Sequence, residues 1–151
     1  MSGKSTVPGP DKADLSGLEG LLDVAESVRV LRYPHETEAD EEGQTTEWHC
    51  DIVVVDNVPA PGFTTYATVG ARGLPTNVTT PDGRQIRSEF VTVGRTGHRA
   101  MADVLDACAL AVATGSIHVA PGAVIPGAVG LVDSGRRCEH LGLTPPFLWP
   151  D

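Results

Sequence analysis

With 151 residues, 40% of them hydrophobic, the chain can bury roughly 70% of its unfolded surface around one core, which predicts a single domain. No apolar run approaches the roughly 18 residues that a membrane span needs, and the first residues lack the apolar core of a secretory signal. The three cysteines are odd in number and widely spaced, which favours reduced thiols in a cytoplasmic protein over a disulfide framework or a zinc site.

The net charge of -9 is carried by the first two fifths of the chain. Residues 1–60 contain thirteen acidic and four basic residues, whereas residues 61–151 contain seven of each. Acidic residues are most concentrated in residues 35–47 (HETEADEEGQTTE), where six acids have no basic neighbour. Nucleic acid is a poor partner for such a surface, because phosphate binding needs clustered Lys and Arg, whereas a basic protein suits it. A solvated loop without a partner is the alternative interpretation.

The chain begins with a segment of tail composition. Residues 1–13 have the Pro, Gly and Ser content of a flexible tail, and residues 14–151 are expected to form the domain. A short amphipathic helix is predicted over residues 14–27, because Ser16 and Glu19 have the spacing of a capping box and apolar residues follow at helical intervals.

Three strands are predicted next. Residues 28–33 alternate imperfectly and predict a strand that ends at Pro34. The β-branched run within residues 48–55 predicts a central strand covered on both faces. A proline-containing turn at residues 57–62 then leads to a strand over residues 64–69.

The middle of the chain predicts a hairpin and a helix. Asp82 and Gly83 are a hairpin signal, so residues 85–93 are expected to pair with a preceding strand. Residues 97–114 place apolar side chains on one stripe of a helix, and Gly115 stands where a left-handed cap is needed. This helix is expected to cover the sheet.

The expected fold is α/β (α+β): a mainly antiparallel or mixed sheet of about five or six strands covered by two helices. The gaps between strands are too short for parallel crossovers of a dozen or more residues. The last third is rich in Pro and Gly, and residues 141–144 predict a final strand. The predicted core consists of Leu22, Ile52, Val54, Tyr66, Phe90, Met101, Leu105 and Cys108.

Chemistry-bearing residues do not form an obvious active site. On a strand, His49 and Asp51 share one face and Cys50 takes the other, so these three cannot bind one metal by themselves. Cys138 and His140 have i, i+2 spacing and could share one face of a strand. The acid between them, Glu139, points the other way and cannot orient the histidine. The glycines of TVGARGLP lack the third glycine and the GK[ST] ending of a phosphate loop.

Residues 51–75 (DIVVVDNVPAPGFTTYATVGARGLP) resemble suppressor-of-fused-like domains, in which an "hxDhhhhxP" strand precedes an "xxLhTxGhSxxPM" strand and a glycine turn. RSEFVTV is similar to the family's "xELhhxhP" strand, and a covering helix, HVAPGAVIP and CEHLGLTPP follow in the family's order. The resemblance covers about residues 20–146. The matching positions are Asp51, Thr68, Gly70, Pro75 and Glu89. Arg72, Gly73 and Thr76 depart from the family's usual Ser, Asp and Met.

The resemblance implies a non-enzymatic, protein-binding domain without a cofactor. Eukaryotic members bind and sequester a transcription-factor peptide, and small bacterial members are regarded as immunity proteins that neutralise a polymorphic toxin. A basic toxin domain would match the acidic half of this chain.

Partner-binding residues are expected in the acidic segment and in the glycine turn after the second strand. They are Glu38, Asp40, Glu41, Glu42, Arg72 and Gly73. Two other function classes stay open. One is a small hydrolase or metal-binding protein that uses His98, His118, His140 and Cys138, and the other is an assembly factor or chaperone.

Overall fold

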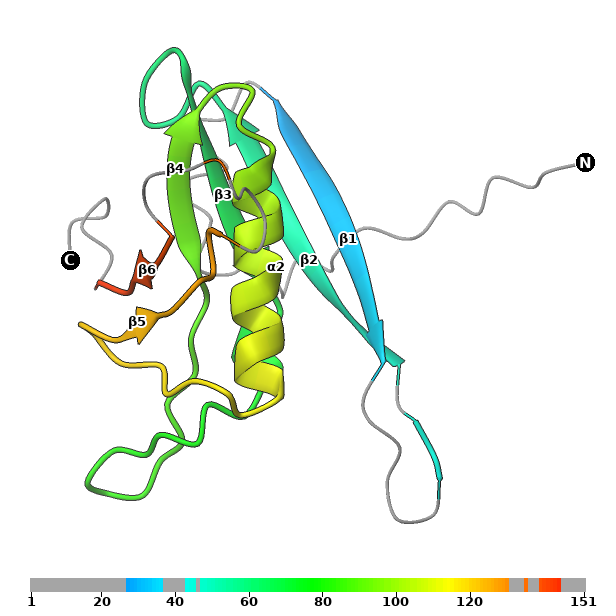
Figure 1. Cartoon of the computed structure of the whole chain (residues 1–151), viewed down its shortest axis with the longest axis vertical. Helices are drawn as coiled ribbons and strands as arrows, with labels where there is room; N and C mark the ends of the chain where they lie inside the picture. Colours follow the sequence, from blue (N-terminus) through cyan, green and yellow to red (C-terminus); the bar gives the residue numbers. More distant parts are fainter. Residues whose placement is uncertain (1–26, 37–42, 46, 131–134, 136–138, 145–151) are drawn as a thin grey trace, which may run out of the picture.

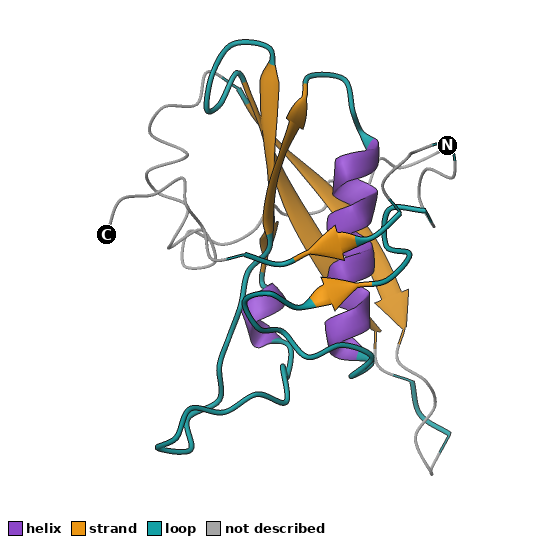
Figure 2. Ribbon diagram, turned by 60° about the vertical axis from the view of Figure 1, so that its left-hand side comes forward, coloured by secondary structure: helices purple, strands orange, loops and turns teal. Residues whose placement is uncertain are grey.

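The computed structural model describes residues 27–36, 43–45, 47–130, 135 and 139–144. Four antiparallel strands form the main sheet in chain order, namely β1 (Val28–Glu36), β2 (Glu47–Asp56), β3 (Phe63–Val69) and β4 (Val91–Arg95). The remaining elements are the 3-10 helix η1 (Ala71–Gly73), the helix α2 (Ala100–Ala113), and the strands β5 (Val124–Ile125) and β6 (Leu141–Gly142). Figures 1 and 2 show α2 against one face of the main sheet, with β5 and β6 beside the helix.

The antiparallel α+β architecture is confirmed, but the expected single sheet of five or six strands is wrong. The described residues form a four-stranded sheet and a separate two-stranded sheet, with one α-helix. The predicted strand at residues 141–144 is shorter and pairs with β5 instead of joining the main sheet. The tail at residues 1–13 and the helix at residues 14–27 lie outside the described residues.

The predicted strand over residues 85–93 also begins later than expected. Only the end of this segment belongs to β4, and an isolated bridge joins Thr79 to Gln85. Threonine side chains form hydrogen bonds with some of the backbone groups between this bridge and β4. Thr76 Oγ1 donates to the Ile86 carbonyl at 2.6 Å, and the Phe90 N–H donates to Thr68 Oγ1 at 2.8 Å. Continuous pairing with β3 therefore begins only at Val91.

β1 continues through the proline that was expected to end it. Pro34 pairs with His49 in the β1–β2 register, and the strand runs on to Glu36. β1 is the edge strand of the main sheet, with β2 as its neighbour. An edge strand tolerates proline where the missing N–H faces away from the neighbouring strand.

β2 is covered on both faces, as the sequence predicted. Ile52 and Val54 point into the cluster under α2, whereas Val53 and Val55 point into a second cluster on the opposite face. All four side chains are buried. The second cluster includes Val58, because the turn after β2 folds back over that face. Thr65 Oγ1 holds this turn by donating to the Val58 carbonyl at 2.8 Å.

α2 covers the other face of the sheet, in agreement with the prediction, but it begins at Ala100, three residues later than expected. Its end is confirmed: Gly115 has a φ of 68° and its N–H donates to the Val112 carbonyl at 3.0 Å. Within the described part of the chain, no helix has both the length and the apolar character needed to cross a bilayer.

Most of the predicted core is confirmed. Ile52, Val54, Tyr66, Phe90, Leu105 and Cys108 are buried in one cluster. Met101 packs against that cluster while partly exposed, and Leu22 lies outside the described residues. Residues of the β5–β6 region also pack there, among them Ile125 and Leu141. The cluster under α2 therefore joins the two sheets.

An ion pair fixes the edge strand to its neighbour. Arg32 on β1 and Asp51 on β2 are cross-strand partners, and their side chains meet in two hydrogen bonds, 2.7 Å from Nε to Oδ1 and 2.6 Å from an Nη to Oδ2. Asp51 is only 3% exposed. A buried carboxylate needs such a partner, because an unpaired buried charge is costly.

Replacing Leu105 with Ala is expected to lower the free energy of unfolding by about 2–5 kcal/mol, because the side chain is 2% exposed and leaves a cavity. Urea denaturation measures this. Leu110→Ala on the same helix is the matched control, since Leu110 is 38% exposed and should cost far less. Equal losses for the two variants would show that the helix buries a different face.

Replacing Arg32 with Ala is expected to cost about 3 kcal/mol, the lower end of the range for leaving a buried charge unpaired, since the guanidinium is partly exposed. Arg29→Ala is the control. Arg29 is 59% exposed and its pair with Asp56 should contribute less than about 1 kcal/mol. Adding Asp51→Asn should restore most of the stability lost with Arg32, and a double variant as unstable as Arg32→Ala would contradict this account.

Candidate functional site

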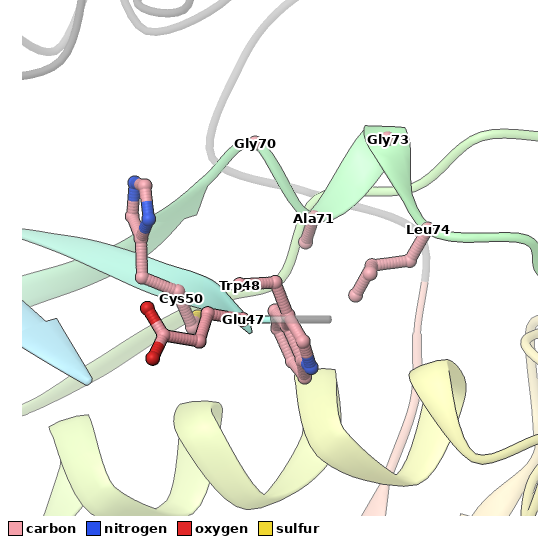
Figure 3. Close-up of a pocket in the computed structure, with 8 residues that line it drawn as sticks. Glu47, Trp48, Cys50, Gly70, Ala71, Gly73 and Leu74 are labelled. Atoms are coloured by element: carbon pink, nitrogen blue, oxygen red, sulfur yellow. The ribbon is translucent and has the colours of Figure 1, made fainter. Parts of the chain in front are cut away.

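The first residues of β2 extend past the end of β3. The last β2–β3 pair joins Asp51 to Val69, so residues 47–50 have β1 as their strand partner within the described residues. The chain that leaves β3 turns at Gly70 into η1 beside them. Between β2 and η1 lies a pocket of about 340 Å³ (Figure 3). It is lined by Glu47, Trp48, His49, Cys50, Gly70, Ala71, Gly73 and Leu74.

The pocket has mostly apolar walls and a charged rim. Figure 3 shows Ala71 and Leu74 pointing toward Trp48. The Trp48 indole stacks on His35, with ring centroids 4.4 Å apart and an interplanar angle of 25°, and this contact fixes the orientation of the indole. The acidic residue in this lining is Glu47, which is exposed. Such a pocket suits a side chain with an apolar stem and a cationic end.

The η1 wall of the pocket is held by a carboxylate. Glu89 Oε1 accepts from the N–H groups of Gly70 (2.9 Å) and Arg72 (3.2 Å), and Glu89 Oε2 accepts from Thr68 Oγ1 (2.7 Å). The glycine turn therefore already carries an anion of its own chain. Its resemblance to a phosphate loop has this structural explanation, because the backbone N–H groups that would bind phosphate are occupied.

A guanidinium holds the other end of the same turn. One Nη atom of Arg87 donates to the carbonyls of Gly73 at 3.0 Å and Leu74 at 3.1 Å. Arg87 and Glu89 lie two residues apart, so one segment binds the donors at the start of η1 and the acceptors at its end. The turn is thereby fixed in position, which is what a binding surface requires.

Polar pairs join β1 to α2 next to the pocket. The Tyr33 hydroxyl donates to Asp103 Oδ1 at 2.6 Å, and His35 Nε2 lies 2.6 Å from Asp106 Oδ1. Burial raises the pKa of Tyr33, and the hydrogen bond to Asp103 adds to the shift, so the phenol stays protonated and donates. Burial also raises the pKa of Asp106, against the opposing effect of His35. The histidine that supports Trp48 is thus itself anchored to the helix.

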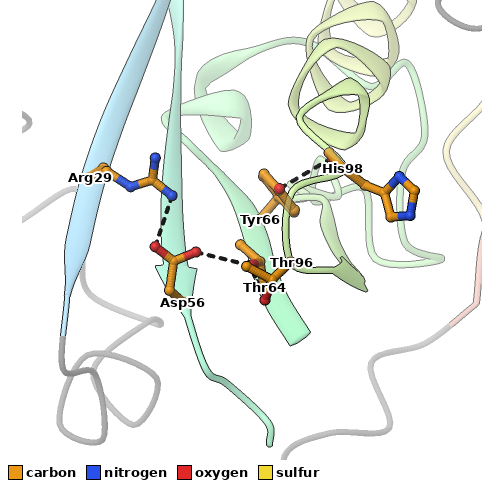
Figure 4. A network of polar contacts seen from close by, with 6 residues as sticks. All are labelled: Arg29, Asp56, Thr64, Tyr66, Thr96 and His98. Atoms are coloured by element: carbon orange, nitrogen blue, oxygen red, sulfur yellow. Dashed lines mark hydrogen bonds and ion pairs between the residues drawn. The ribbon is translucent and has the colours of Figure 1, made fainter. Parts of the chain in front are cut away.

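A second polar network closes the opposite end of the main sheet (Figure 4). Asp56 accepts hydrogen bonds from Arg29 at 2.8 Å and from Thr64 at 2.9 Å. The Tyr66 hydroxyl donates to the backbone carbonyl of His98 at 3.2 Å. These contacts connect β1, β2 and β3 to the turn before α2, so we assign this network a role in holding the fold together.

The sequence-predicted partner-binding residues divide into two groups. Glu38, Asp40, Glu41 and Glu42 lie outside the described residues. The ends of the acidic segment are described: Glu36 and Glu47 are cross-strand partners, and both are exposed.

Arg72 and Gly73 belong to η1, and Gly73 lines the pocket together with Glu47. The structure therefore brings the base of the acidic segment next to the glycine turn. The two lie more than twenty residues apart in the chain.

The histidines named for a catalytic or metal site are spread over the structure. His98 precedes α2 and His118 follows it, and a 14-residue helix spans about 21 Å, so these two cannot share one site. His140 Nδ1 accepts the N–H of Gly127 at 3.0 Å. Cys138 lies outside the described residues, which leaves its pairing with His140 a prediction. The part of the chain that the structure describes holds no group of three or more His, Cys, Asp or Glu residues suited to a metal ion.

The two described cysteines are poor nucleophiles. Burial raises the pKa of Cys50 to about 12 and that of Cys108 to about 11. Both thiols therefore stay protonated near neutral pH, and the thiolate is the reactive form. His49 and Asp51 lie on the strand face opposite Cys50, as predicted, with His49 Nε2 3.7 Å from Asp51 Oδ2.

The sequence interpretation missed the pocket residues Trp48, Ala71 and Leu74 and the positioning role of Glu89. Only Glu89 carried a usable signal, since it matches the acid of the family's "xELhhxhP" strand. Trp48, Ala71 and Leu74 become neighbours only because β2 extends beyond its pairing with β3 and η1 folds beside that extension.

Comparison with known proteins gives one relative and one family. The chain is 29% identical over 101 residues to immunity protein YqcF of Bacillus subtilis (strain 168), an alignment that covers 67% of this chain and 52% of the relative. The chain thus spans about half the length of the curated relative it matches. No solved structure matches the chain significantly. The family model for Suppressor of fused protein (SUFU) matches residues 46–151, which is more than half of the chain. The chain therefore belongs to the suppressor of fused family.

Proposed function

We propose that this chain is an immunity protein, a non-catalytic domain over residues 14–151 that binds and neutralises a toxin in the bacterial cytoplasm. The observation that carries the proposal is the similarity to a relative named as an immunity protein, over two thirds of this chain. Membership of the suppressor of fused family supports it, since that resemblance implies protein binding.

The described chemistry agrees better with binding than with catalysis. Buried, protonated thiols and histidines at opposite ends of a helix offer no nucleophile next to a base. The pocket beside η1, by contrast, has a fixed wall and a charged rim on an exposed part of the surface. Shape and charge held in place are what recognition of a protein partner needs.

The charge of the chain supports a basic toxin as the proposed partner. An inhibitor of net charge -9, with its excess acid in residues 1–60, suits a basic toxin domain and repels nucleic acid. Glu38, Asp40, Glu41 and Glu42 are proposed to attract the toxin, and Arg72 and Gly73 to touch it.

The proposal predicts a toxin gene next to the gene for this chain, and co-expression of the two genes tests it. The chain is expected to restore growth of cells that make the toxin, and to elute with the purified toxin domain in one complex. A toxin of unrelated sequence is the control and should remain lethal. Growth that stays blocked, with the chain expressed and folded, would overturn the proposal. Neighbouring genes for metabolic enzymes would favour the hydrolase or metal-binding alternative, and genes for a secreted particle would favour the chaperone alternative.

Neutralising Glu38, Asp40, Glu41 and Glu42 together, by Gln and Asn, is expected to slow association with the toxin about tenfold at low salt. Dissociation should change little, because exposed charges are screened over about 8 Å at physiological salt and contribute little after docking. Stopped-flow measurements at several salt concentrations report both rates. The matched control neutralises Asp11, Asp14, Glu19 and Asp23, which changes the net charge equally. An equal slowing in the control would show that total charge, not this segment, matters.

A further inference from the structure

The pocket beside η1 has features that specify its occupant. Its apolar walls are Trp48, Ala71 and Leu74, and Glu47 is the acid at its rim. Arg72 lies between two lining residues but does not itself line the pocket. With His49, which also lines the pocket, counted as neutral, the lining residues carry one formal negative charge from Glu47. The volume of about 340 Å³ is large enough for a single long side chain.

A like-charge pair stands next to this rim. Glu36 and Glu47 are direct cross-strand partners, and both are exposed. Like charges directly opposite each other on neighbouring strands destabilise a sheet. A cation placed at the rim would relieve this repulsion, so the base of the acidic segment is complementary to a positive charge from outside.

We propose, on the basis of the immunity function above, that this pocket receives an arginine side chain of the toxin. The aliphatic stem lies between Leu74 and the Trp48 indole. The guanidinium extends across the edge of β2 to the Glu47 carboxylate, which alternation along the strand places on the opposite face from Trp48. Arginine fits better than lysine, because its planar group binds a carboxylate through two parallel N–H groups. A phosphate or a carboxylate would be repelled by Glu47.

Glu89 and Arg87 act in this site as positioning residues. They hold η1, and with η1 the Ala71 and Leu74 walls, at a fixed distance from β2. His35 does the same for Trp48 from the other side. The pocket is therefore formed before the partner arrives, which lowers the entropic cost of binding.

A pair of short peptides tests the pocket without the toxin. One is acetyl-Ala-Arg-Ala-amide, and the other carries citrulline, which has the same size but no charge, in place of arginine. Both are titrated into the full, 15N-labelled chain. The arginine peptide is expected to shift the Trp48 indole signal and the amide signals of Ala71 and Gly73 in a saturable way. The citrulline peptide should bind roughly fivefold more weakly.

The two acids at the base of the segment provide a matched pair of variants. Glu47→Gln is expected to weaken binding of the arginine peptide roughly fivefold. Glu36→Gln makes the same charge change outside the pocket and is expected to weaken binding less than about twofold, because its carboxylate acts only at a distance. Both side chains are exposed, so neither variant should unfold, and the amide spectrum of each verifies this.

Three results would overturn the proposal: equal binding of the two peptides, equal weakening by the two variants, or no shift at Trp48. Failure of the immunity function has a different signature. Wild-type chain that does not protect cells refutes that function, while the peptide titration still decides the pocket. Where protection does hold, Glu47→Gln should speed dissociation of the toxin about fivefold and Glu36→Gln less than about twofold.

Discussion

Burial of β2 on both faces is the constraint on which the other elements depend. The run of β-branched residues at 52–55 places alternate side chains in two different apolar clusters, so the strand needs a cover on each side and a neighbour at each edge. α2 supplies one cover, and the turn after β2 packs Val58 against the other face. Because β3 pairs only as far as Asp51, the beginning of β2 has the chain after β3 beside it, and the pocket forms there.

Polar groups in this structure are satisfied in pairs that fix the elements around β2. Arg32 neutralises the buried Asp51 and ties the edge strand to the sheet. On the other face of β1, hydrogen bonds to Asp103 and Asp106 tie the same strand to α2. β1 is thus positioned by geometry-sensitive contacts as well as by apolar burial. Such contacts specify one arrangement more sharply than apolar packing does, because an unpaired buried group is costly.

The same principle shapes the proposed binding surface. A glycine turn would be free to move, yet Glu89 and Arg87 hold both of its ends. Trp48 is fixed by its stacking on His35. A suppressor of fused domain with these features can present a prepared pocket beside an acidic segment, which separates two tasks. In the function proposed above, charge spread over the segment accelerates encounter at a distance, and the proposed arginine pocket provides the specific contact once the partners touch.

The sequence by itself determined the elements whose signals are local. The β-branched run predicted β2, the stripe from Met101 to Val112 predicted α2, and Gly115 predicted its left-handed end. It also determined the family, through Asp51, Thr68, Gly70 and Glu89. Only the tertiary structure decided what depends on strand register. Pro34 stays within β1 because β1 is an edge strand, and β6 pairs with β5 instead of the main sheet. Glu47, Trp48 and Leu74 come together because β2 is longer than β3, a property of pairing that no local pattern encodes.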